Sequence, residues 1–155
     1  MTQPALTREG INAAVFGLIQ AVPGIVTCSR RLRHWADVPD EERPALFLAK
    51  AKEFPIQDPS GLPTVWRYEF VIYLYVVQKD QSMAPSTAIN SILDAIESAL
   101  RPVQFGPQGF PGSLQVLGDT TGRIRRAWIS GAVETDEGAL GDQSIATVPI
   151  EVEVA

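Results

Sequence analysis

Two stretches of the chain carry apolar residues at spacings of three and four, the period of an amphipathic helix. The first is predicted to form a helix over Arg8–Ala21, with Thr7 as its N-cap. Its apolar positions are Ile11, Val15, Leu18, Ile19 and Val22. The second is predicted to begin near Pro85 or Ser86 and to end at Pro102. Its apolar positions are Ile89, Ile92, Leu93, Ile96 and Leu100.

Other stretches alternate with the period of two that is typical of strands. The strongest is Thr64–Gln78, and shorter strands are predicted over Ile25–Leu32 and Ala45–Phe54. One face of the long strand is large and apolar or aromatic: Trp66, Tyr68, Phe70, Ile72, Leu74 and Val76. At about 3.3 Å per residue this tract reaches roughly 45 Å. We therefore expect it to run past the sheet, to bend, or to cover a second layer supplied by a partner chain.

The end of the sequence is predicted to form a large β-hairpin with arms Gly122–Val133 and Ser144–Val154. Between the arms, Glu134–Gln143 is predicted to be a ten-residue loop. This loop carries four carboxylates and no basic residue: Glu134, Asp136, Glu137 and Asp142. A long charged hairpin tip suggests a contact surface or disorder, because two-residue turns suffice to close a hairpin.

The order helix, three strands, helix, two strands indicates a single α+β domain over residues 1–155 with a mostly antiparallel sheet. We expect both helices to pack on one face of it. The other face, which bears Tyr73 and Tyr75, is then left to solvent or to neighbouring chains. Residues 103–121 and 134–143 are predicted to be mobile loops, and Pro55–Pro63 a turn.

The formal net charge is −5, so the molecule as a whole should not be drawn to nucleic acid or acidic membranes. No apolar run reaches the roughly 20 residues that span a bilayer, and no signal peptide is evident at the N-terminus. The sequence is therefore interpreted as that of a soluble protein made in a cytoplasm. The single cysteine excludes an intramolecular disulfide and any multi-cysteine metal site.

Candidate chemistry is sparse. His34 is the only histidine, and neither a positioned partner nor a pocket is visible for general acid–base work. Cys28 is interpreted as a small, partly buried hydrophobic residue within a strand. Asp94 and Glu97 form a solvated helix face without a third ligand. No catalytic residue, metal site or cofactor is predicted.

Two arginine clusters stand out against the acidic background: Arg30, Arg31 and Arg33, and Arg123, Arg125 and Arg126. The first lies beside Trp35, a combination that single-strand nucleic-acid binders use. Contact between these arginines and the acidic loop of another copy is the more attractive interpretation, since charge complementarity fixes the register between subunits. Solvated surfaces without a partner remain a serious alternative to both interpretations.

Several local strings resemble the tail terminator, or tail completion, family of long-tailed bacteriophages and prophages. The strings lie at Cys28–Trp35, Pro44–Phe47, Trp66–Val77, Ile89–Ile96, Trp128–Gly131, Gly138–Gln143 and Val148–Ile150. The resemblance covers most of the chain from residue 8 onward.

The resemblance implies a structural virion protein without enzymatic activity. Such proteins form a ring, commonly of six subunits, that caps the tail tube, stops its polymerisation and presents a surface to the head-side connector. The expected partners are other copies of the chain, the tail tube protein and the head-completion protein. A ring needs two different patches on each subunit, and the arginine clusters and the acidic loop are the candidates. The alternatives are another neck component of similar fold, a nucleic-acid-binding module, or an enzyme that uses His34 or Cys28.

Overall fold

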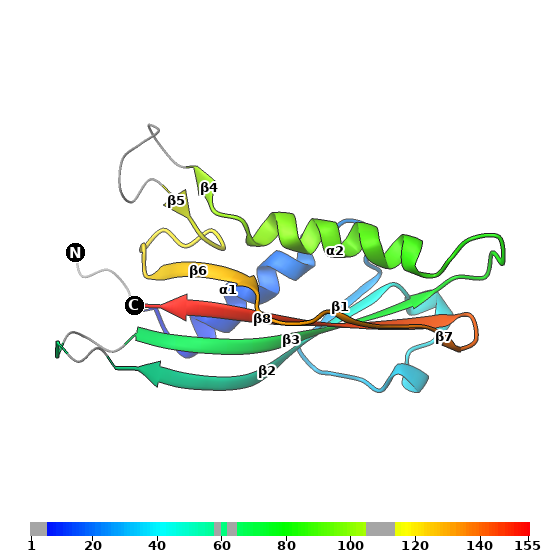
Figure 1. The fold of residues 1–155 in the computed structure, drawn as a ribbon, viewed down its shortest axis with the longest axis horizontal. Helices are drawn as coiled ribbons and strands as arrows, with labels where there is room; N and C mark the ends of the chain where they lie inside the picture. Colours follow the sequence, from blue (N-terminus) through cyan, green and yellow to red (C-terminus); the bar gives the residue numbers. More distant parts are fainter. Residues whose placement is uncertain (1–5, 58–59, 62–64, 105–113) are drawn as a thin grey trace.

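The computed structural model describes residues 6–57, 60–61, 65–104 and 114–155, which form one twisted sheet with two helices on one of its faces (Figure 1). The helices are α1 (Arg8–Gln20) and α2 (Ser86–Leu100), with two short 3-10 turns, η1 (Trp35–Asp37) and η2 (Asp40–Glu42). The strands are β1 (Thr27–Ser29), β2 (Ala45–Ile56), β3 (Val65–Val77), β4 (Val103–Gln104), β5 (Leu114–Gln115), β6 (Ile124–Ile129), β7 (Glu134–Leu140) and β8 (Gln143–Val154). The main sheet has the order β1-β2-β3-β8-β6, with β7 also paired to β8, and the α+β prediction is confirmed.

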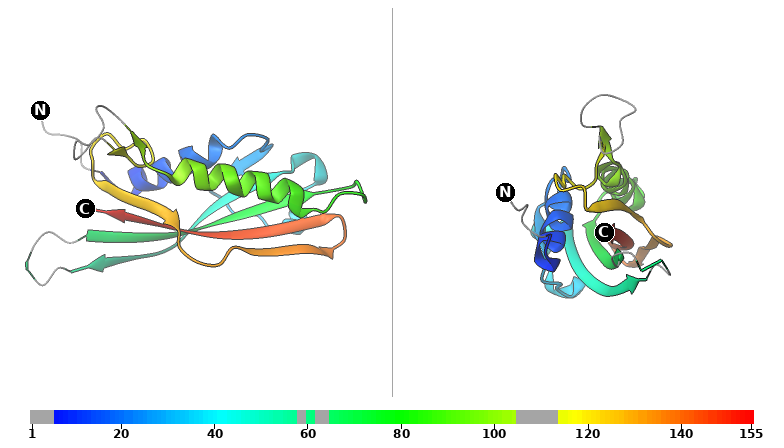
Figure 2. Two further views of the ribbon diagram at one scale, coloured as in Figure 1. Left: turned by 45° about the horizontal axis from the view of Figure 1, so that its top comes forward. Right: turned by 90° about the vertical axis from the view of Figure 1, so that its left-hand side faces the viewer.

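Both predicted helices form close to their expected ends. Thr7 caps α1, because its side-chain oxygen accepts a hydrogen bond from the backbone N–H of Gly10 at 3.0 Å. The apolar stripes of both helices pack on the same face of the sheet and form the main core. The end-on view in Figure 2 shows the sheet curling beneath the two helices.

β3 is the centre of the sheet and is paired on both sides. Its predicted inward face is confirmed, since Tyr68, Phe70, Ile72 and Leu74 are all buried against the helices. Its neighbours β2 and β8 are each 12 residues long and follow it along nearly its whole length. The strand therefore does not run past the sheet, because each neighbour is only one residue shorter than β3.

The region after α1 departs from the prediction. The strand expected over Ile25–Leu32 is only three residues long, and it runs parallel to β2 rather than antiparallel. The Ser29 hydroxyl accepts a hydrogen bond from the N–H of Arg31, and the chain then leaves the sheet. We call the following segment, residues 30–44, the strap.

The strap covers part of the sheet face that was expected to be left to solvent or neighbours. Val38, Ala45, Phe47 and Tyr75 form a small second core between the strap and the sheet. Arg43 holds the strap together: its guanidinium is buried and donates to the carbonyl oxygens of Trp35 and Val38 at 2.6–3.0 Å. Only the remainder of this face, including the half-buried Tyr73, stays open.

The C-terminal hairpin differs most from its prediction. Residues 134–143 are not a ten-residue loop, because Glu134–Leu140 form β7, which pairs with β8. Only a tight turn, with Gly141 at a positive φ of 74°, separates the two strands. Two predicted connections lie partly outside the described residues: the loop over residues 103–121 and the turn over Pro55–Pro63. The described ends of the first one include β4 and β5, which pair with each other.

Candidate assembly interface

The outer edge of β8 carries two strands in succession. β6 pairs with residues 150–154 and β7 with residues 143–147, so the two strands lie at opposite ends of the molecule (Figure 1). Within the part of the chain that the structure describes, neither β6 nor β7 has a strand on its other side. Their outward N–H and C=O groups therefore form an open sheet edge.

The β7 part of this edge is acidic. Glu134, Thr135, Asp136 and Glu137 are all exposed, as expected for the residues of an edge strand with no cover. The strand alternation directs Glu134 and Asp136 to one face of the sheet and Thr135 and Glu137 to the other. Three of the four predicted carboxylates thus lie on a strand of fixed geometry, while Asp142 lies in the turn and its backbone carbonyl accepts from the N–H of Gln78 at 2.8 Å.

Glu137 also contributes to the fold. Its Oε1 accepts a hydrogen bond from the backbone N–H of Ser86 at 2.9 Å, which satisfies an amide at the start of α2. Hydrogen bonding from the Ser86 side chain and from its backbone N–H holds the pKa of Glu137 below its ordinary value. Pro85, the N-cap residue of α2, supplies no side-chain cap, so a strand distant in sequence replaces it.

The β6 part of the edge is basic. Arg123 donates to the backbone oxygen of Ala155 at 2.7 Å, and Arg126 pairs with Glu153 at 3.0 Å while stacking on Trp128. Arg125 is exposed, and none of the described residues forms an ion pair with it. Of these three arginines, Arg125 is therefore the one that has no ion pair among the described residues.

The other arginine cluster is mostly engaged within the chain. Arg30 pairs with Glu9, and Arg33 pairs with Glu42 at 2.6 Å. Arg31 alone is exposed without an ion pair among the residues described. This cluster lies in the strap, where Arg33 faces Ile145 and Thr147 in the part of β8 that pairs with β7, whereas the second cluster lies on β6 at the other end of β8. The two arginine clusters therefore do not form one basic surface.

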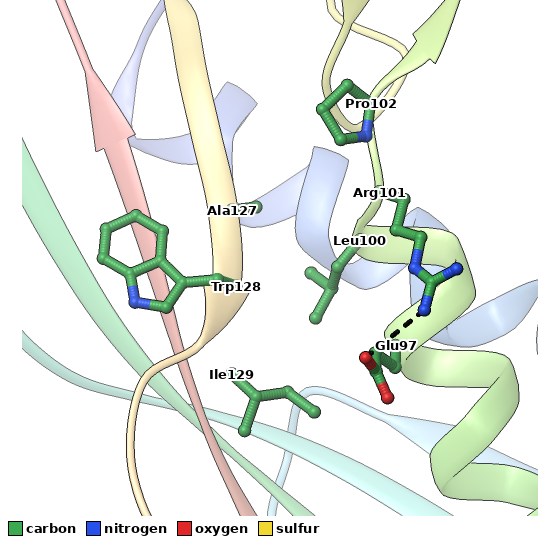
Figure 3. A pocket seen from close by; sticks show the side chains of 7 residues that line it. All are labelled: Glu97, Leu100, Arg101, Pro102, Ala127, Trp128 and Ile129. Atoms are coloured by element: carbon green, nitrogen blue, oxygen red, sulfur yellow. Dashed lines mark hydrogen bonds and ion pairs between the residues drawn. The ribbon is translucent and has the colours of Figure 1, made fainter.

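A groove of about 450 Å³ runs between β6 and the C-terminal end of α2 (Figure 3). Ala127 and Ile129 point from β6 toward Leu100 of α2, whereas Trp128 points away from the helix (Figure 3). Arg101 lies at the rim and pairs with Glu97 at 3.5 Å. The groove thus has an apolar floor with a paired charge at its rim, a feature that the sequence could not reveal because its two walls are about 30 residues apart.

A second groove, of about 440 Å³, lies on the open face beside the strap. Its lining is mainly apolar and aromatic: Leu32, Arg33, His34, Trp35, Tyr73, Tyr75, Ile145 and Thr147. The Tyr75 hydroxyl donates to the backbone oxygen of Arg33 at 2.8 Å and so fixes one wall. His34 has a structural role in this groove. Its Nδ1 accepts a hydrogen bond from the backbone N–H of Ala36 and so caps η1.

The remaining candidate chemistry is also accounted for structurally. Burial raises the pKa of the Cys28 thiol, which keeps it protonated and weakly nucleophilic. Glu97 forms the ion pair described above. Among the described residues no group of three or more His, Cys, Asp or Glu side chains is arranged to hold a metal ion. No helix in this part of the chain is long and apolar enough to cross a membrane.

Comparison with solved structures finds a similar fold. The chain is similar to a chain of the virion of a native gene transfer agent particle, with a TM-score of 0.54 and 12% sequence identity over 93% of each chain. A second solved structure, 14% identical over 97% of each chain, has a TM-score of 0.48 and is too distant to support an argument. No family model and no curated protein sequence matches the chain. At this identity the similarity shows that the fold is shared.

Proposed function

We propose that this chain is a structural virion protein, and specifically a tail terminator that assembles into a ring on the end of a tail tube. The main support is the shared fold with a chain of a virion particle, which extends over 93% of both molecules. The resemblance of the local strings to the tail terminator family points in the same direction and supplies the specific role. In this role the ring, with six subunits as its expected number, stops tube polymerisation and presents a surface to the head-side connector.

The distribution of charge supports assembly with other copies. A ring requires two different patches on each subunit, so that the second patch is still free after the first is occupied. The acidic β7 and the basic β6 are two such patches, and they lie at opposite ends of one molecule (Figure 1). Since most of the arginines already have acceptors within the chain, a broad cationic surface for nucleic acid is less well supported.

The test is the native mass of the purified protein by light scattering, with negative-stain images of the same fraction. A closed ring of about six copies is expected, either alone or after addition of tail tubes from the same phage, and tubes capped by the protein should stop growing. A protein that stays monomeric and leaves tube growth unchanged would overturn the proposal.

A further inference from the structure

We propose that the groove between β6 and α2 receives β7 of a second copy, which adds to the free edge of β6 as an extra strand. The inference rests on the proposed self-assembly and specifies the contact that performs it. It replaces a general attraction between charged patches with a defined main-chain interaction. β-strand addition of this kind takes its affinity from backbone hydrogen bonds and its specificity from side chains in adjacent pockets.

The sheet edges of this molecule differ in how well they are protected. On the opposite side of the sheet, β1 covers the first three residues of β2, and beyond them the strand carries Lys50 and Lys52 with a register shift between them. Lysines and bulges are the usual means by which proteins keep an edge strand from pairing with other chains. From Glu134 to Glu137, β7 pairs regularly with β8 and carries no lysine, arginine or proline, so this segment remains suited to pairing. β6 has a register shift between Ile124 and Arg126, but from Arg126 to Ile129 it pairs regularly with β8, and these four residues form the open edge that can receive a strand.

The charges select which edges can meet. Two β7 strands placed side by side would bring carboxylates together, and two β6 strands would bring arginines together; both arrangements are unfavourable. β6 against β7 of another copy instead places Arg125 and Arg126 beside Glu134 and Asp136. Only the pairing of unlike edges is therefore favoured, and this gives the association a direction.

The groove supplies the space and an apolar floor for the incoming strand. Leu100, Ala127 and Ile129 line it, and these side chains can pack against Thr135 of β7 (Figure 3). Glu137, on the same face of β7, stays bonded to Ser86 of its own chain. Two negative features are present, namely Glu97 and the carbonyl end of α2. Arg101 lies next to both and pairs with Glu97, and the residues of β6 that line the groove are uncharged.

The contact repeats without occupying both edges of one molecule. When β7 of copy one fills the groove of copy two, copy one still has an open groove and copy two still has a free β7. Each copy can therefore bind one neighbour on either side. Such head-to-tail contacts close into a ring when the rotation between neighbours allows it.

The experiment uses site-directed cross-linking in a Cys28→Ser background, which removes the only cysteine. A Ser130→Cys variant, with the new thiol beside β6, is mixed with a differently tagged Thr135→Cys variant, with the thiol on β7. Each chain then carries one cysteine, so the mixed product with a short bismaleimide must join two molecules. The matched control replaces Thr135→Cys by Ala51→Cys, an exposed position on the protected edge of β2.

We expect the Ser130–Thr135 product to exceed the control product and both homodimers several-fold. The yield should fall at high salt and on adding Arg125→Glu, and it should recover with Glu134→Lys in the partner chain. Arg31→Glu, at an exposed arginine of the strap, should leave the yield unchanged. A Ser130–Thr135 yield no greater than the control would overturn the inference. If rings were still seen in negative stain, the proposed function would stand without this contact. If neither rings nor tube capping were seen, both the inference and the proposed function would be overturned.

Discussion

Ile96 and Leu100 lie one turn apart on α2, and the structure predicts that truncating them has different consequences. Ile96 is fully buried at 0% exposure within the main core, whereas Leu100, at 3%, forms the floor of the groove between α2 and β6. Alanine at Ile96 leaves a closed cavity, while alanine at Leu100 widens a space that solvent already reaches. Stability should therefore depend on the surroundings of the two side chains more than on their size.

The size of each effect follows from the atoms removed. Each substitution deletes three carbons, and at about 0.8 kcal/mol per buried carbon the transfer term is about 2.4 kcal/mol in both cases. A closed cavity at Ile96 raises the cost to about 4 kcal/mol, within the range of about 2 to 5 kcal/mol for such truncations. For Leu100→Ala we expect about 2 to 3 kcal/mol, because little cavity remains enclosed. Differences in helix propensity change this comparison by only a few tenths of a kcal/mol.

The assay is equilibrium unfolding in urea, followed by the fluorescence of the three tryptophans. Unchanged m-values would show that the free energies of unfolding of the variants can be compared directly. If Leu100→Ala lowers the free energy of unfolding as much as Ile96→Ala does, then the groove is closed in solution, and the reasoning about it is refuted.

Three further predictions concern the strap and the turn before β6. Arg43→Met should release the strap, because two backbone carbonyls lose their charged donor at a cost of about 1 to 3 kcal/mol. Backbone amides of residues 33–43 should then exchange their hydrogens faster, and unchanged exchange would contradict the role given to Arg43. Tyr75→Phe should lower the free energy of unfolding by about 1 kcal/mol through loss of one hydrogen bond, with Tyr73→Phe as the control of smaller effect. Burial raises the pKa of Asp119, but hydrogen bonds from Ile124 and its neighbours outweigh this and hold the pKa below its ordinary value. The stability that Asp119 contributes is therefore present at neutral pH and is lost as the pH falls below about 4. Asp119→Asn should lower the free energy of unfolding at pH 7, and the two proteins should become equally stable as the pH falls below about 4. A difference in stability that does not change with pH would argue against this.

The sequence predicted correctly those elements in which the local hydrophobic pattern matches the face that the fold buries. The stripe Ile89–Leu100 and the alternation Trp66–Val76 each specify one buried face, and both predicted faces are confirmed. Thr7 likewise caps α1 as expected, because an N-cap hydrogen bond involves only residues three apart. These features depend on neighbours within a single element.

β7 was missed because it carries no such pattern. Glu134–Glu137 are exposed on both faces, so no alternation of apolar and polar residues marks them as a strand. The backbone of β8, with which they pair, is what makes them one. For the same reason the acidic segment was interpreted as a loop, although its place at the sheet edge is what makes it a candidate interface.

The sequence by itself determined the two helices, the long central strand and the overall α+β class, since hydrophobic burial imposes its period on the chain. Only the tertiary structure decided which charges remain free. Arg30, Arg33 and Arg126 are engaged by Glu9, Glu42 and Glu153, and those pairings bring together residues up to 27 positions apart. Ion pairs and open sheet edges depend on which segments the fold places side by side, and a one-dimensional pattern of residues does not contain that information.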